Sequence, residues 1–374
     1  MARFGKHITL IVVLIAIVAI IGVLELRKPA QSGGEGSDIT ITDTNERVAM
    51  KEKEFERAKE ISTPDGFINA TEDFNIKDLI GKKVVLVDFW TYSCINCQRT
   101  LPYLNAWNKK YADEGLVIIG LHTPEFEFEK NYENVKRAVE KWGIEYPVVL
   151  DNDYSTWRAY KNQYWPRKYL IDIDGFIVYE HIGEGGYKET EEKIVALLNE
   201  RARVLGEGGV VVSDTAPENV DTVDFGKVRS PEMYFGYARV ENLVNPLKST
   251  CTDSVCRYEK PATIPLNGFA LSGAWNIERE KATLADSSGS VTLYFNANKV
   301  NLVAGADGAV RAEIYLDGKK VTENHAGYSV GSGVVEFNEH DLYNLIDLRG
   351  QYGAHELEIR FLDGSVSAFA FTFG

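Results

Sequence analysis

The chain has 374 residues and a formal net charge of −14, with 44% hydrophobic and 26% charged residues. This length predicts two folded domains plus linkers, and the composition is that of globular proteins rather than of disordered ones. The acidic balance argues against nucleic acid as a partner, because phosphate binding requires clustered lysine and arginine side chains.

The N-terminus places Arg3 and Lys6 before an apolar run from Ile8 to Leu24. As a helix this run is roughly 26 Å long, against about 30 Å for the hydrocarbon core of a bilayer. The residues from Glu25 to Pro29 offer no small-residue cleavage motif, which favours an uncleaved anchor over a cleaved signal peptide. We therefore expect residues 1–28 to form a single transmembrane helix in the cell membrane, with the soluble domains on the extracytoplasmic side.

A tether and an α/β domain are expected next. Residues 29–62 predict a flexible tether followed by a charged helix over 47–60. Residues 63–205 then alternate apolar strand patterns, such as Lys83–Trp90, with amphipathic helix patterns, such as Asn134–Trp142. This alternation predicts an α/β fold whose mixed sheet is covered on both faces.

The pattern of strands and turns in the sequence changes after a linker at residues 206–230, which contains the run GEGG. Residues 231–374 read as short strands separated by Asp-Gly turns at 307–308, 317–318 and 363–364. Asp-Gly between alternating strands is a hairpin signal. This pattern predicts an all-β sandwich of the jelly-roll type.

The chemistry is concentrated in the segment VVLVDFWTYSCINCQRTLP, from Val84 to Pro102. A strand leads into a helix whose first turn carries Cys94, where unpaired backbone N–H groups favour the thiolate form. Cys97 follows one helical turn later, so it can close a disulfide with Cys94 and release a bound partner. This arrangement predicts thiol–disulfide exchange, with Cys94 as the attacking group and Cys97 as the resolving group.

Other residues extend this prediction. Asp88 lies on the apolar strand before Cys94, where burial should raise its pKa and suit it to take the proton of Cys97. Pro102 is placed to kink the helix. The Trp165–Pro166 bond is a candidate cis peptide, which would offer strand-like pairing to an extended substrate.

The cysteines have three other interpretations. A zinc site formed with Cys251 and Cys256 is disfavoured because the C-x-x-x-x-C spacing is unusual for zinc, so no metal site is predicted. A purely structural Cys94–Cys97 bridge closes too short a loop to constrain the chain. A thiol peroxidase of the AhpC/TSA type has Thr91 at the right spacing before Cys94, but Val87 replaces the proline of that motif.

Some residues outside this segment carry two interpretations each. Cys251 and Cys256 predict a local structural disulfide rather than a second redox relay. His122 is either a tuning group for a thiolate or a hydrogen-bonded loop residue. Trp275 and neighbouring tyrosines either stack on sugars or belong to a β core, so a surface carbohydrate-binding protein with an accessory redox domain is an alternative function.

The sequence resembles a known family. Asp88, Trp90, Cys94, Cys97, Pro102 and Pro166 match the thioredoxin-fold pattern, and the stretch between Gly120 and Tyr146 is similar to the extra segment of the redoxin branch, which includes TlpA-like proteins. GLHTPEFEFEKNYENV, YPVVLDND, QYWPRKYLID and SPEMYFGYARV resemble the soluble C-terminal half of DipZ-type proteins. The resemblance covers roughly residues 63–374.

The resemblance implies a thioredoxin-like (redoxin) domain followed by a module similar to carbohydrate-binding β-sandwiches. The exported, anchored architecture predicts an enzyme that reduces disulfides in cell-envelope proteins, with oxidation or isomerisation of such disulfides as the alternatives. No cofactor is expected, and Trp90, Trp165 and Pro166 are expected to contact the substrate. A single apolar segment stands where DipZ proteins have a multi-spanning domain, so a separate membrane electron donor similar to CcdA or DsbD is the expected source of electrons.

Overall fold

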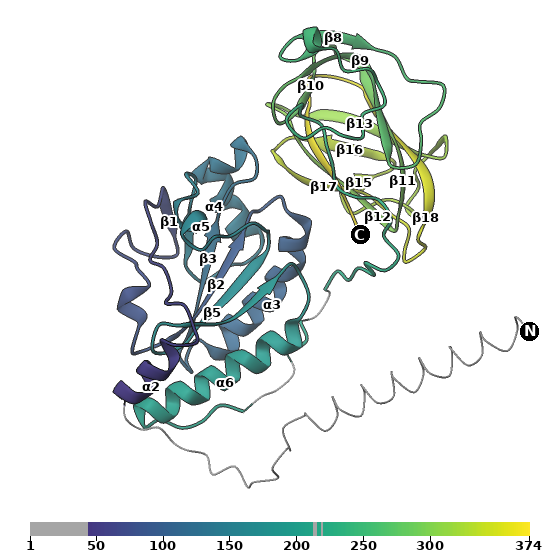
Figure 1. Cartoon of the computed structure of the whole chain (residues 1–374). Helices are drawn as coiled ribbons and strands as arrows, with labels where there is room; N and C mark the ends of the chain where they lie inside the picture. The colour runs from purple at the N-terminus through teal and green to yellow at the C-terminus, as the bar shows by residue number, and fades with distance from the viewer. Residues whose placement is uncertain (1–43, 212–214, 218–219) are drawn as a thin grey trace, which may run out of the picture. The chain divides into compact units, whose positions relative to one another are not determined.

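The structure, a computed structural model, describes residues 44–211, 215–217 and 220–374 (Figure 1). The predicted transmembrane helix at 1–28 and most of the predicted tether lie outside these residues. Within the part of the chain that is described, no helix combines the length and the apolar character needed to cross a bilayer.

The first described helix, α2 (Thr44–Lys51), is shorter than the sequence predicted. The expected helix to residue 60 is wrong, because the chain turns after Lys51 and Arg57 forms a bridge with Phe176. The Lys51 ammonium pairs with three carboxylates, Asp172 at 2.6 Å, Asp174 at 2.9 Å and Glu200 at 2.5 Å. These acidic groups are close enough to hold a cation, and Lys51 supplies the positive charge.

The thioredoxin-like domain follows the predicted alternation of strands and helices. Its six-stranded mixed sheet has the order β1-β4-β3-β2-β5-β6, in which β2, β3 and β4 are parallel and the remaining pairs are antiparallel. The elements are β1 (Gly66–Ile68), η1 (Lys77–Leu79), β2 (Val84–Trp90), α3 (Ile95–Tyr111), β3 (Leu116–His122), η2 (Glu127–Lys130), α4 (Tyr132–Lys141), β4 (Val148–Leu150), α5 (Ser155–Ala159), β5 (Arg167–Ile171), β6 (Ile177–Ile182) and α6 (Tyr187–Leu205).

Alternation along β2 determines which of its side chains face helix α3. Successive side chains of a strand point to opposite faces, so Val84, Leu86, Asp88 and Trp90 share one face. Val84, Leu86 and Trp90 pack in one core with residues of α3, α4 and α6, whereas the intervening residues of β2 pack in a second core on the other face. Asp88 therefore lies on the face covered by α3, which carries Cys97.

The second domain is all-β. Its elements are β7 (Met233–Tyr234), η3 (Ser249–Cys251), β8 (Val255–Tyr258), β9 (Gly268–Ile277), β10 (Ala282–Leu284), β11 (Gly289–Ala297), β12 (Lys299–Gly305), β13 (Val310–Leu316), β14 (Lys319–Lys320), β15 (Val330–Gly331), β16 (Val334–Phe337), β17 (Asp341–Asp347), β18 (Gly353–Phe361) and β19 (Ser367–Phe373). A single core of buried aliphatic and aromatic residues fills the domain.

The predicted two-sheet sandwich is realised as one continuous 13-stranded sheet that forms a near-barrel. Strand β9 connects its two parts, because residues 268–272 pair with β11 and residues 273–277 pair with β8 and β10. Gly273 lies at the change of partner with φ +106°, a backbone conformation that side chains other than glycine rarely adopt.

The Asp-Gly turns do not all close hairpins. Asp317-Gly318 joins the paired strands β13 and β14, and both residues have positive φ, as a two-residue hairpin turn requires. The turn at 307–308 connects β12 to β13, and the turn at 363–364 connects β18 to β19, but neither pair of strands is hydrogen-bonded. The prediction of hairpins at these two turns is wrong, because each turn carries the chain to a different part of the sheet.

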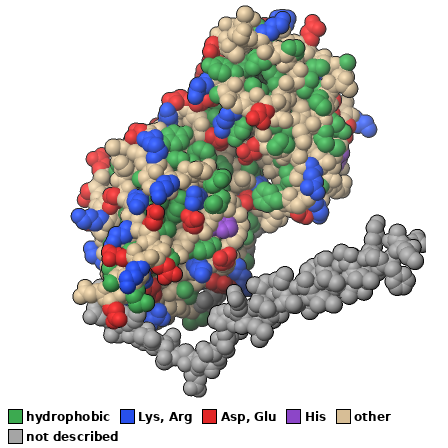
Figure 2. Space-filling view, viewed as in Figure 1, with side chains coloured by type: hydrophobic (Ala, Val, Ile, Leu, Met, Phe, Trp, Pro, Cys, Tyr) green, Lys and Arg blue, Asp and Glu red, His purple; other side chains and the backbone are tan. Residues whose placement is uncertain are grey.

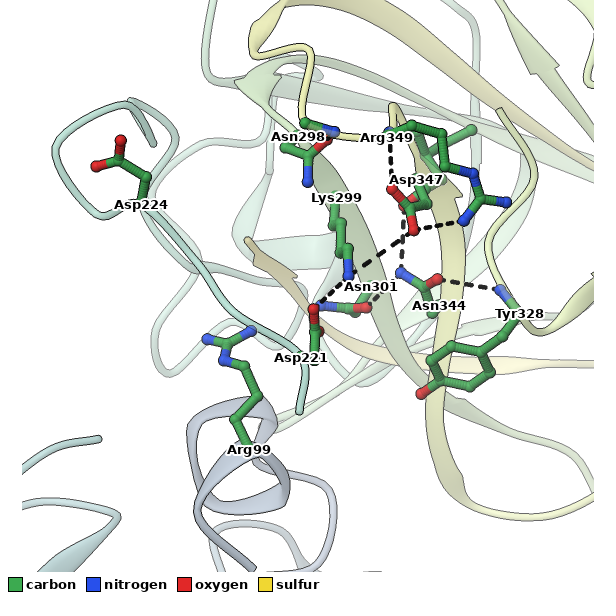
Figure 3. A network of polar contacts seen from close by, with 12 residues as sticks. Arg99, Asp221, Asp224, Asn298, Lys299, Asn301, Tyr328, Asn344, Asp347 and Arg349 are labelled. Atoms are coloured by element: carbon green, nitrogen blue, oxygen red, sulfur yellow. Dashed lines mark hydrogen bonds and ion pairs between the residues drawn. The ribbon is translucent and has the colours of Figure 1, made fainter. Parts of the chain in front are cut away.

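A polar network attaches the linker to the second domain (Figure 3). Lys299 of β12 pairs with Asp221 of the linker and lies 3.8 Å from Asp347 at the end of β17. Arg349 binds the same Asp347 carboxylate at 2.7 Å. The ion pair between Lys299 and Asp221 attaches the linker to the domain, and the charges of Asp347 and Arg349 complete a neutral network around it. Acidic and basic side chains are also interspersed over the described surface that Figure 2 shows.

Cys251 and Cys256 form a disulfide in the second domain, with a sequence separation of 5. The double variant Cys251→Ser/Cys256→Ser is expected to lose about 2 kcal/mol of unfolding free energy, because so short a loop removes little entropy from the unfolded chain. Urea unfolding of the full chain measures this loss, and unchanged stability would contradict a structural role for this disulfide.

Candidate active site

The two cysteines lie where β2 leads into α3. Cys94 is the N-cap of α3, with φ −81° and ψ 117°, and its Sγ accepts a hydrogen bond from the backbone N–H of Cys97 at 3.3 Å. Both are free thiols in this structure. Cys94 is partly exposed whereas Cys97 is 1% exposed, so only the first sulfur is accessible to another protein.

Hydrogen bonds hold the connection between β2 and α3. The Cys94 N–H donates to the Thr91 carbonyl at 3.3 Å, and the Gln98 side-chain amide donates to the Tyr92 carbonyl at 2.8 Å. Thr123 after β3 donates to the Trp90 carbonyl at 3.0 Å. These bonds give Cys94 a defined position at the start of the helix, where helix N–H groups stabilise negative charge.

Asp88 and Lys168 form a buried acid–base pair beneath α3. The two residues are directly opposite in the antiparallel register of β2 and β5, and they are 1% and 0% exposed. Burial raises the pKa of Asp88 to about 7, and the positive charge of Lys168 opposes that shift. Burial lowers the pKa of Lys168, against the attraction of Asp88 and Cys97. The Lys168 ammonium also donates to the Gly183 carbonyl at 3.3 Å.

The environment of Cys97 disfavours its thiolate. Burial raises the pKa of the Cys97 thiol, as do its hydrogen bond with Cys94 and the negative charge of Asp88. A buried thiol of this kind needs a nearby base to become nucleophilic. Asp88 has the pKa for this task near neutral pH, and its Oδ1 has no hydrogen-bond partner among the residues that the structure describes.

His122 and Glu129 hold the residues just before Cys94. The His122 Nε2 accepts the Tyr92 N–H at 3.3 Å, and burial lowers the pKa of the ring to about 3, so the ring is neutral. Ser93 Oγ donates to Glu129 Oε1 at 2.5 Å, and burial raises the pKa of Glu129 to about 7, with the charge of Glu125 adding to the shift. His122 is therefore a buried positioning group rather than an exposed partner of the thiolate.

Two of these groups were not predicted from the sequence. Lys168 stands in the strand RKYLI, where a lysine normally marks a solvent-facing position, and only its 0% exposure reveals a functional setting. Glu129 stands in the acidic run EFEFEK, whose pattern gives no reason to single out one carboxylate. The apolar neighbours of Lys168 were the available signal.

The predicted substrate-binding residues differ in position. The Trp165–Pro166 bond is cis, and the Trp165 indole N–H donates to the Thr123 carbonyl at 3.0 Å. Trp165 is partly exposed and lines a cavity of about 460 Å³ together with Cys94. Trp90, the third residue predicted to contact the substrate, is 1% exposed and lies edge-on to His122 at 5.2 Å.

The remaining candidate residues lie in the second domain. Cys251 is bonded to Cys256, so these sulfurs do not complete a zinc site with Cys94 and Cys97. Trp275 is fully buried and donates its indole N–H to the Ser272 carbonyl at 3.0 Å. The interpretation of Trp275 as a sugar-stacking residue is therefore wrong, and the residue belongs to the β core.

Each of the two domains matches a known protein family. Residues 58–198 match the Redoxin family, and residues 230–374 match the family described as Thioredoxin like C-terminal domain. Protein DipZ of Mycobacterium bovis is 34% identical over 311 residues, which is 83% of this chain and 41% of DipZ. The chain thus spans about two fifths of the length of that relative.

Smaller relatives match the thioredoxin-like domain alone. Thiol-disulfide oxidoreductase YkuV of Bacillus subtilis is 30% identical over 124 residues, which is 33% of this chain and 83% of YkuV. A solved structure, a thiol:disulfide interchange protein DsbE from Chlorobium tepidum, is 22% identical and covers 38% of this chain and 96% of its own, with a TM-score of 0.34. The match to the Redoxin family and the identity with YkuV, 83% of whose length is covered, show that the chain belongs to the redoxin family of thioredoxin-fold thiol–disulfide oxidoreductases.

Proposed function

We propose that this chain reduces disulfides in proteins outside the cytoplasm through a dithiol–disulfide cycle of Cys94 and Cys97. The observation that supports this proposal best is the contrast between the two sulfurs. Cys94 is partly exposed at the N-terminus of α3, whereas Cys97 is 1% exposed and has the Asp88–Lys168 pair on the same side of the sheet. The Cys94 sulfur is accessible to a substrate disulfide, whereas the Cys97 sulfur stays buried until it reacts with Cys94.

In the first step the Cys94 thiolate attacks one sulfur of the substrate disulfide. A bond forms between Cys94 Sγ and that sulfur, the substrate S–S bond breaks, and the released thiolate takes a proton from water. The product is a mixed disulfide between the two proteins. The N–H of Cys97, 3.3 Å from Cys94 Sγ, stabilises the attacking thiolate before this step.

In the second step Asp88 accepts the proton of Cys97, and the Cys97 thiolate attacks Cys94 Sγ. The Cys94–Cys97 disulfide forms, the mixed disulfide breaks, and the second substrate sulfur leaves as a thiolate that takes up the proton released by Asp88. Two electrons have then moved from the enzyme to the substrate, and the two product thiols have received one proton from water and one from Cys97 by way of Asp88. The positive charge of Lys168 stabilises the Asp88 carboxylate, which makes it available as a base near neutral pH.

Return to the dithiol requires an external two-electron donor, and we propose a dithiol carried by a membrane protein. The apolar run from Ile8 to Leu24 supports an anchored location close to such a donor. The Cys251–Cys256 disulfide supports an oxidising, extracytoplasmic compartment, because such bonds are rare where glutathione keeps thiols reduced.

The reduction potential of the Cys94–Cys97 couple tests this function. Equilibration of the full chain against dithiothreitol or glutathione buffers is expected to give a value close to that of thioredoxin, about −270 mV. The Cys251→Ser/Cys256→Ser variant serves as the control, because it leaves a single redox couple.

A measured potential close to about −120 mV would make the chain an oxidant and reverse the proposed direction of electron flow. A Cys94–Cys97 pair that forms no disulfide in any buffer would contradict the oxidoreductase function itself.

A further inference from the structure

One of the two residues between the cysteines, Ile95, is covered by the second domain. Ile95 follows Cys94 in the first turn of α3, yet it is only 6% exposed. It packs in one buried cluster with Phe126 and with residues of β12, β17 and β19. Those second-domain residues are Val303, Leu342, Phe369 and Ala370. A surface that a substrate would otherwise reach is therefore occupied by the protein's own second domain.

Aromatic side chains extend the contact around Ile95. Residues 48–374 form a single compact unit, so both sides of this contact belong to one body. The ring of Phe369 lies 5.2 Å from that of Phe126 and 4.7 Å from that of Phe128. Aromatic pairs of this kind stabilise a contact beyond the area they bury.

Polar contacts surround the apolar cluster. The Tyr92 hydroxyl donates to the His340 carbonyl at 3.1 Å, so the segment before Cys94 is itself bound to the second domain. The ion pairs across the contact are Lys141–Asp341 at 2.5 Å, Arg137–Glu339 at 3.7 Å and Arg239–Glu125 at 2.8 Å. An apolar centre with a charged rim is the organisation of specific protein interfaces.

Cys94 faces a groove with one wall from each domain. The cavity of about 460 Å³ is lined on one side by Tyr164 and Trp165, next to Pro166. On the other side it is lined by residues of the linker and second domain, among them Phe225 and Tyr234. The Arg239 guanidinium lies 3.7 Å from the centre of the Tyr234 ring, which supports that wall.

We infer that the second domain is a wall of the redox site, and that it selects protein substrates which present the reacting cysteine on an extended segment. This inference rests on the proposed function. A segment that enters between Trp165 and Tyr234 meets aromatic surface on both sides, and aromatic side chains dominate the energy of such contacts. A disulfide held on a compact, convex fold cannot approach Cys94, because the second domain occupies the space over Ile95.

The test compares three disulfides with the full chain. Hydroxyethyl disulfide is small, a pair of linear peptides joined by one disulfide is extended, and insulin carries its disulfides on a compact fold. The measured quantity is the selectivity, defined as kcat/KM for the linear peptides divided by kcat/KM for insulin. The wild-type chain is expected to favour the linear peptides by at least about tenfold, which is about 1.4 kcal/mol.

Charge reversal opens the contact without touching the groove. The double variant Arg137→Glu/Lys141→Glu places like charges opposite Glu339 and Asp341, and like-charge juxtaposition disrupts interfaces. We expect the selectivity to fall about tenfold, while activity on hydroxyethyl disulfide stays within about twofold. Adding Glu339→Lys/Asp341→Lys restores opposite charges and is expected to restore the selectivity.

Two further variants complete the design. Lys320→Glu breaks the 2.7 Å pair with Glu313 inside the second domain and is the matched control, with no expected change. Tyr234→Ala widens the groove directly, so it is expected to lower the selectivity even where charge reversal fails to open the contact. Hydrogen exchange of the peptide that carries Ile95 reports opening independently of activity.

Unchanged selectivity in both Tyr234→Ala and the charge-reversed variant would overturn the inference. So would a wild-type chain that reduces insulin as readily as the linear peptides, although the proposed function would then still hold. A wild-type chain that reduces none of the three disulfides would instead contradict the proposed function.

Discussion

Replacing Cys97 by serine is expected to stop turnover and to leave the substrate joined to Cys94 in a stable mixed disulfide. The first attack needs only Cys94, which is partly exposed and accepts the backbone N–H of residue 97 whatever its side chain. The second attack needs the Cys97 sulfur, and serine cannot replace it. Incubation with a disulfide-linked peptide pair, followed by mass spectrometry without reductant, measures an adduct of one peptide per chain.

The controls separate the two sulfurs. Cys94→Ser is expected to form no adduct, because Cys97 is 1% exposed and out of reach of a substrate. Cys251→Ser/Cys256→Ser is expected to turn over normally. An adduct that forms at residue 97 in Cys94→Ser would exchange the roles proposed for the two cysteines.

Replacing Asp88 by asparagine is expected to stabilise the chain above neutral pH and to slow release of the mixed disulfide. The pKa of this carboxyl is raised by burial from 3.8 to about 7. Between these values the folded chain holds a proton that the unfolded chain has lost, so wild-type stability falls as the pH rises through this window. At pH 8 the variant is expected to be more stable by on the order of 2–4 kcal/mol, since one pKa unit is about 1.4 kcal/mol.

The kinetic effect has the opposite sign. Without a base, deprotonation of Cys97 is slow, and we expect a loss of about 100-fold in the rate of the second step at pH 8. In the wild-type chain this rate is expected to rise with pH through about 7 and then level, and the rise should be absent in Asp88→Asn. Stopped-flow measurement of mixed-disulfide decay gives the rate, and urea unfolding at pH 5 and pH 8 gives the stability.

Glu72→Gln is the matched control for this change, because it removes an exposed carboxylate from the same domain. It is expected to change neither the pH dependence of stability nor the decay rate. An Asp88→Asn chain that loses stability at pH 8, or one whose mixed disulfide decays at the wild-type rate, would contradict the role proposed for Asp88.

The positions of several site residues could be predicted from local sequence patterns. Helix α3 begins at Ile95 with Cys94 as its N-cap, within one residue of the prediction, because the start of a helix depends on nearby residues. The position of Asp88 on the buried strand β2 was predictable for the same reason, since that strand and its spacing from Cys94 are local features. Lys168 was missed because its importance depends on the register of β2 against β5, which the sequence of neither strand specifies.

The second domain shows the same limit. Asp317-Gly318 closes a hairpin as predicted, but the turns at 307–308 and 363–364 join strands that are not paired. A turn motif specifies local backbone geometry, whereas the partner of each strand depends on contacts between residues distant in the chain. The bend of β9 at Gly273 joins the two parts of the sheet in the same way.

The sequence by itself thus determined the α/β and all-β order of the domains, the position of Cys94 and Cys97 at the start of α3, and the position of Asp88 on the preceding strand. Helix starts, strand alternation and residue spacing are short-range properties. Only the tertiary structure decided that Trp90 and Trp275 are buried, that Lys168 faces Asp88, and that the second domain covers Ile95. Burial and strand pairing depend on which distant segments pack together. A tryptophan or lysine looks the same in the sequence whether its side chain lies in the core or at the surface.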